Sequence, residues 1–144
     1  MVDLRNDTEK IEKFIVAGLE KFSEEVQNPV MMGVYSCPWA SWISLNFKIT
    51  YSLDGRSYYC PDFDFVEYDF MEFKNWEEEY HGAEGTWIIN DSNVYNSTHD
   101  DGSERLNKFF FGYLKDVLIG LNNKHKLPST LLQMLDSNCC EKVI

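Results

Sequence analysis

The stretch that decides the fold is residues 41–51, which read Ser-Trp-Ile-Ser-Leu-Asn-Phe-Lys-Ile-Thr-Tyr. In an extended chain, successive side chains point to opposite faces. One face would carry Ile43, Leu45, Phe47, Ile49 and Tyr51, and the other Ser44, Asn46, Lys48 and Thr50. One apolar face and one polar face predict a strand of an antiparallel sheet that is covered on one side only. Asp54-Gly55 then indicates a hairpin turn, so we expect residues 56–60 to return as the next strand.

Two long amphipathic helices are predicted on either side of this strand. Residues 8–27 repeat apolar side chains at three- and four-residue spacing, and Asn6 with Glu9 fits a capping box. Residues 104–122 carry a wider apolar stripe behind Ser103, which suits an N-cap. After Pro128, we expect Ser129 to cap a last short helix that carries several leucines.

The remaining segments complete an α+β pattern. Residues 30–36 and 86–89 are expected to be short strands. Residues 61–80 are expected to contain the end of a strand and then a helical turn, with a capping box at Asp69–Glu72. Residues 90–103 are rich in Asn, Asp, Ser and Gly and predict an exposed loop. Strands and helices do not alternate as in parallel β-α-β units. The prediction is therefore an α+β fold, an antiparallel sheet of four to five strands with N-terminal and C-terminal helices packed on one face.

Length and composition predict a single domain, residues 1–144, of the cytoplasmic type. The N-terminus lacks the basic start and apolar run of a signal peptide, and no apolar stretch is long enough to span a bilayer. The four cysteines form no C-x-x-C pair, and the three histidines are far apart in the sequence. Asp62-Phe63-Asp64 resembles the acid pair of some metal-dependent transferases, although so short a pattern arises by chance in an acidic chain. We predict no catalytic residue, metal or cofactor.

Charge is concentrated in one segment. The net charge is −11, and residues 61–80 hold eight acids against Lys74, a net −7. Such a field repels nucleic acid and anionic lipid and attracts basic proteins. The candidate partner-binding residues are Asp62, Asp64, Glu67, Asp69, Glu72, Trp76, Glu77, Glu78 and Glu79, beside the aromatic residues Phe63, Tyr68 and Tyr80. The alternative is a solvated acidic edge whose aromatic side chains point into the core.

The layout resembles the immunity proteins of bacterial polymorphic toxin systems. The resemblance covers nearly the whole chain: the helix at 8–27, the strand at 41–51 with its Asp54-Gly55 turn, the acidic middle with Trp76 and the helix at 104–122. It implies an inhibitor that binds a cognate toxin domain, commonly a basic nuclease, without chemistry. Two alternatives remain open: a nucleic-acid mimic that binds a DNA-handling protein, and a small enzyme with an unrecognised site. Nothing in the sequence predicts the oligomeric state.

Overall fold

The computed structural model describes residues 2–51, 59–73, 85–90, 93–97 and 102–144. Within these ranges the elements are, in chain order, β1 (Val2–Asp3), α1 (Thr8–Glu25), β2 (Met31–Cys37), η1 (Pro38–Ala40), β3 (Trp42–Lys48), η3 (Cys60–Asp62), β4 (Phe65–Glu72), β5 (Gly85–Asn90), β6 (Asn93–Ser97), α3 (Gly102–Lys124), β7 (Ser129–Met134) and β8 (Cys140–Lys142). None of the helices in the described part of the chain is both long and apolar enough to cross a bilayer.

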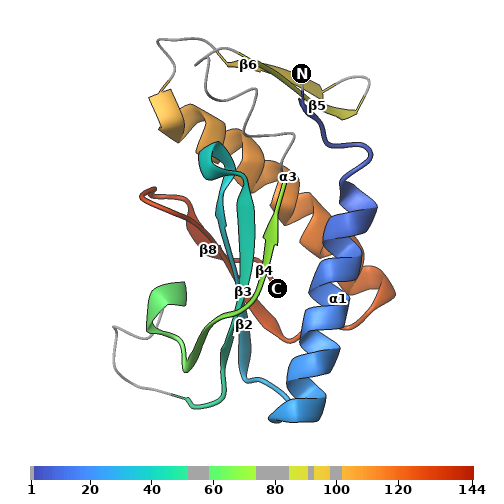
Figure 1. Cartoon of the computed structure of the whole chain (residues 1–144), viewed down its shortest axis with the longest axis vertical. Coiled ribbons are helices and arrows are strands. Elements are labelled where there is room, and N and C mark those ends of the chain that lie inside the picture. The colour runs from blue at the N-terminus through green and yellow to red at the C-terminus, as the bar shows by residue number, and fades with distance from the viewer. Residues whose placement is uncertain (1, 52–58, 74–84, 91–92, 98–101) are drawn as a thin grey trace.

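The described strands form two sheets, which confirms the α+β class (Figure 1). The larger sheet has the order β4-β3-β2-β7-β8, and the smaller has the order β1-β5-β6. The prediction that all pairs are antiparallel is wrong, because β2 pairs with β7 in parallel and β1 pairs with β5 in parallel. Both parallel pairs join segments far apart in the sequence, so a search for consecutive β-α-β units could not find them.

The predicted last helix at Ser129 is instead strand β7. This strand lies between β2 and β8, and it is buried on both faces. A strand that is covered on both sides has a continuous apolar run rather than an alternation. The neighbouring leucines at 131 and 132 therefore fit a helix or a strand equally well in the sequence, and the pairing with β2 decides between them.

Strand β3 is covered on both faces, so the prediction of one solvated face is wrong. On one face Leu45 and Phe47 are fully buried under α1, where Phe22 stacks on Phe47 with 4.2 Å between ring centroids. On the other face Ser44 and Asn46 are also fully buried. Residues 59–63 fold over part of this second face, and Figure 1 shows η3 on the opposite side of the strands from α1.

In the described part of the chain, the strand that pairs antiparallel with β3 on this side is β4, which begins after the predicted return at residues 56–60. Residues 52–58, with the Asp54-Gly55 turn, lie outside the described residues, and Cys60 belongs to the 3-10 turn η3. Asp69–Glu72 is part of β4 rather than a helix start, and β6 occupies part of the predicted loop at 90–103. Cross-strand pairing supplies hydrogen bonds that outweigh the local turn and capping preferences of these residues.

The long helices match their predicted ranges within a few residues. Helix α1 begins at Thr8 without a side-chain cap, so the predicted capping box at Asn6 and Glu9 does not form. The apolar side chains of the two helices and of β3 supply much of the core. Leu45, Phe47, Phe110 and Leu114 are fully buried, whereas Phe14 and Leu19 are partly buried.

Candidate functional site

The structure places five of the predicted partner-binding residues on η3, on β4 and between them: Asp62, Asp64, Glu67, Asp69 and Glu72. Strand β4 is an edge of the five-stranded sheet and is hydrogen-bonded to β3. The other four predicted residues, Trp76, Glu77, Glu78 and Glu79, lie outside the described residues. Their part in binding stays a prediction.

Two of these carboxylates make contacts within the protein. Asp64 accepts hydrogen bonds from the backbone N–H groups of Ile49, at 2.8 Å, and Thr50, at 3.3 Å. The hydrogen bond from Ile49 is the main reason that the pKa of Asp64 lies below its ordinary value. Asp69 is half-buried and lies next to Gly18 of α1. Asp64 therefore ties the end of β3 to the start of β4, and Asp69 faces the helix.

The other three carboxylates, those of Asp62, Glu67 and Glu72, are exposed. Among the described residues none of them has an ion-pair partner or accepts a hydrogen bond. Glu67 sits at a bulge, with a left-handed φ of 51°, and its N–H donates to Oδ1 of the buried Asn46 at 2.8 Å. We call Asp62, Glu67 and Glu72 the acidic edge. Their negative charges are available to a partner.

A row of aromatic rings crosses the sheet beside Glu72, the last residue of the acidic edge. Tyr35 on β2, Trp42 on β3 and Phe70 on β4 form ring pairs with centroids 5.5 and 5.6 Å apart. Tyr35 and Trp42 are half-buried, and Phe70 is 41% exposed. We call these three residues the aromatic row. Large aromatic side chains that remain partly exposed are common anchors of protein–protein interfaces.

This row is not among the partner-binding residues predicted from the sequence. Of the aromatic candidates from the sequence, Phe63 is buried against Gly33, whereas Tyr68 packs on Phe22 and donates a hydrogen bond to Glu25. That hydrogen bond is the main cause that raises the pKa of Tyr68 to about 12. The sequence does indicate that Trp42 lies off the apolar face. In the alternating strand, Trp42 is two residues from Ser44 and therefore shares the polar face.

Two cysteine thiols of the described chain are protonated at neutral pH. Burial raises the pKa values of the Cys60 and Cys140 thiols, so both stay protonated at neutral pH and are weak nucleophiles. His81 and His99 lie outside the described residues, and His125 is exposed. No group of His, Cys, Asp or Glu side chains within the described ranges could hold a metal ion.

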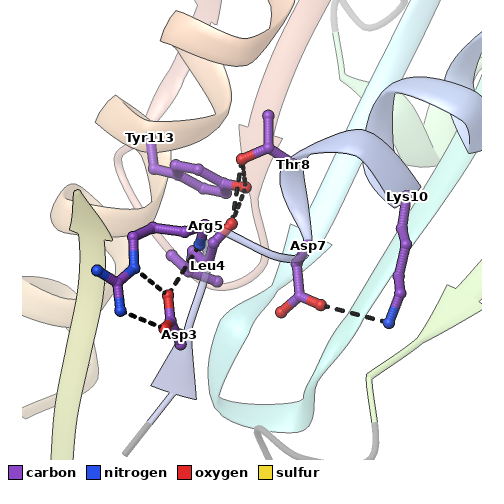
Figure 2. Close-up of polar contacts among 7 residues, drawn as sticks. All are labelled: Asp3, Leu4, Arg5, Asp7, Thr8, Lys10 and Tyr113. Carbon is purple, nitrogen blue, oxygen red and sulfur yellow. Dashed lines mark hydrogen bonds and ion pairs between the residues drawn. The ribbon is translucent and has the colours of Figure 1, made fainter.

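A second polar cluster joins the N-terminal segment to α3 (Figure 2). The hydroxyls of Tyr113 and Thr8 form a hydrogen bond of 2.8 Å with each other, and both lie within hydrogen-bond distance of the backbone carbonyl oxygen of Leu4, at 3.3 and 3.1 Å. Arg5 forms an ion pair with Asp3 beside them. Burial is the main cause that raises the pKa of Tyr113 to about 12. The phenol is therefore neutral and engaged in packing the chain start, rather than a base or nucleophile.

A shallow groove of about 610 Å³ runs between α1 and the end of α3. Val16, Ala17 and Leu121 supply its apolar lining, and Lys124 and Glu12 form an ion pair of 3.1 Å between the two helices. Lys13 likewise forms an ion pair with Glu9, so four of the charged groups in the groove are paired with each other, and Glu20 is left as an exposed carboxylate without an ion-pair partner among the described residues. The acidic edge with the aromatic row is therefore the stronger candidate surface.

The chain matches no protein-family model, and no curated protein or solved structure is significantly similar to it. Its function is therefore argued from the geometry and charge of the surface described above.

Proposed function

We propose that this chain is a non-catalytic inhibitor of the immunity type, which binds a basic toxin domain, such as a nuclease, through the acidic edge and the aromatic row. A cytoplasmic location belongs to the same proposal. The observation that carries it is the combination of three exposed carboxylates on η3 and β4, without ion-pair partners among the described residues, with a row of three partly exposed aromatic rings that runs from β4 across β3 to β2.

Charge supports a basic partner. The net charge of the chain is −11, and eight of its acids fall in residues 61–80. Acids at the rim of an interface accelerate the association of a basic partner, whereas they repel the phosphates of nucleic acid and lipid. This acceleration must decline with salt, because the Debye length falls from about 10 Å at 0.1 M to about 3 Å at 1 M.

The form of β4 supports binding through side chains. The bulge at Glu67 interrupts the register between β3 and β4, and charged side chains lie along the edge. Both features hinder the addition of another strand to a sheet edge. A partner would therefore contact the carboxylates and rings rather than extend the sheet.

The test is binding to the basic toxin domain encoded by the neighbouring gene, measured as association and dissociation rates on a biosensor together with inhibition of the toxin's activity. The variant Asp62→Asn/Glu67→Gln removes two charges of the acidic edge. The matched control Glu20→Gln/Glu24→Gln removes two exposed charges from α1. We expect stoichiometric inhibition by the wild-type chain, and an association rate that falls several-fold in the first variant and much less in the control.

Two results would count against the proposal. The first is an absence of binding by the wild-type chain at micromolar concentration. The second is an equal effect of the two double variants at low salt, because this would mean that the net charge acts without regard to the position of the acids.

A further inference from the structure

The two faces of the five-stranded sheet are covered to different extents. On one face, Leu45 and Phe47 are buried beneath α1. On the other face, Cys60 and Phe63 lie over Gly33, where a Cβ would be only 2.7 Å from the Cys60 sulfur. This small cluster leaves the aromatic row partly exposed farther along the same face. The aromatic row is thus a part of the sheet face that the described chain does not fully cover.

A carboxylate is held next to the central ring of this row. Glu72 of β4 is the register partner of Trp42 of β3. Side chains directly opposite each other on neighbouring antiparallel strands lie on the same face, with Cβ atoms about 5 Å apart. Glu72 is exposed. Phe70 lies two residues before Glu72 on β4, on the same face, and its ring contacts that of Trp42. Trp42 therefore has two aromatic neighbours, and the negatively charged Glu72 lies opposite it on β4.

An aromatic face and a carboxylate attract the same kind of group, a cation. A cation within about 6 Å of a ring centroid is attracted by the ring quadrupole, and Trp is the strongest of the aromatic residues in this respect. Arginine fits better than lysine, because its planar guanidinium can stack on the ring while its N–H groups donate to the carboxylate.

The protein forms such contacts with its own cations elsewhere. Lys21 lies 5.3 Å from the centroid of Tyr68, and Arg105 lies 5.4 Å from that of Tyr95. By contrast, no lysine or arginine among the described residues lies over Tyr35, Trp42 or Phe70. The row with Glu72 is a cation-binding arrangement without a cation from the described chain.

We propose that Trp42 and Glu72 together bind an arginine side chain of the basic partner, with the guanidinium stacked on the indole and hydrogen-bonded to the carboxylate. The inference rests on the proposed function and adds to it the residue type that anchors the partner.

The test titrates ¹⁵N-labelled protein with the peptide acetyl-Gly-Arg-Gly-amide and follows the indole N–H signals by NMR. Trp42→Phe identifies the Trp42 signal. The neutral isostere acetyl-Gly-citrulline-Gly-amide is the control ligand, because it keeps the shape of the side chain and lacks the charge. We expect a saturable shift of the Trp42 indole and of the Phe70 and Glu72 amides with the arginine peptide, and none with the citrulline peptide.

Two variants distinguish binding at Trp42 and Glu72 from a nonspecific attraction of the peptide to the negative charge of the protein. Glu72→Gln should weaken binding of the arginine peptide about two- to five-fold, the range for a cation held at an exposed site. Glu67→Gln removes the same charge from the same strand outside the Trp42 pair and should change the affinity less. Glu72 is exposed, so its substitution should leave the fold intact. An unshifted Trp42 signal, equal shifts with both peptides or equal effects of the two variants would overturn the inference.

The proposed function can fail separately. If the wild-type chain inhibits the toxin domain and Glu72→Gln leaves its dissociation rate unchanged, the arginine site is wrong and the inhibitor proposal stands. If the toxin domain does not bind while the arginine peptide shifts Trp42 as expected, the cation site stands and the inhibitor proposal fails.

Discussion

Helix α1 approaches the five-stranded sheet closely at Gly18, and the substitution Gly18→Ala tests that packing. A Cβ at this position would lie 2.4 Å from Cδ1 of Leu45, which is fully buried. Alanine in a helix interior is favoured over glycine by about 0.5–1 kcal/mol. An extra methyl group in a packed core costs about 1–3 kcal/mol. The clash outweighs the helix preference, so we expect a net loss of about 1 kcal/mol in the free energy of unfolding.

Helix α3 offers the matched controls. A Cβ at Gly112 or Gly120 would meet no atom within 4 Å. Gly112→Ala and Gly120→Ala should therefore each raise the free energy of unfolding by about 0.5–1 kcal/mol, through the helix preference alone. The assay is urea denaturation followed by far-UV circular dichroism. An unchanged dependence on denaturant would show that the variants differ in stability rather than in the extent of unfolding.

The packing explanation also predicts a reversal of sign. Leu45→Ala by itself should cost about 2–5 kcal/mol, because it leaves a cavity in the core. In that background the methyl group added by Gly18→Ala has space, and the substitution should become neutral or stabilising. If Gly18→Ala stabilises the wild-type protein as much as Gly112→Ala does, the close approach of α1 to β3 is wrong.

Three further predictions concern stability. Leu114→Ala should lower the free energy of unfolding by about 2–5 kcal/mol in the same assay, because Leu114 is fully buried. Tyr113→Phe should cost about 1 kcal/mol at neutral pH. Since burial raises the pKa of Tyr113, its contribution is complete below pH 10, and the difference in stability between wild type and variant should shrink in thermal unfolding as pH rises above 10. Asp64→Ala should cost about 1 kcal/mol at pH 7, a value reduced for exposure to water. Because the folded-state pKa of Asp64 is lowered, this contribution is present above its ordinary value of 3.8 and is lost as pH falls through the lowered pKa.

The candidate surface could be predicted from the sequence only in part. The concentration of acids in residues 61–80 is a property of the sequence itself, and their exposure at Asp62, Glu67 and Glu72 follows the ordinary preference of carboxylates for water. The sequence could not separate Asp64 from these three, because its hydrogen bonds to Ile49 and Thr50 depend on how β4 returns beside β3. Nor could it assemble Tyr35, Trp42 and Phe70, which come from three strands.

The sequence by itself determined the two long helices, the strand at 42–48 within the predicted range 41–51, the α+β class and the negative charge. Each of these follows from local periodicity or composition, which nearby residues set without reference to the rest of the chain. Tertiary structure alone decided the burial of the polar face of β3, the parallel pairing of β7 with β2 and the identity of β7 as a strand. The physical reason is that strands acquire their hydrogen bonds and the cover of their faces from residues distant in sequence, so only the assembled sheet fixes which side chains remain exposed.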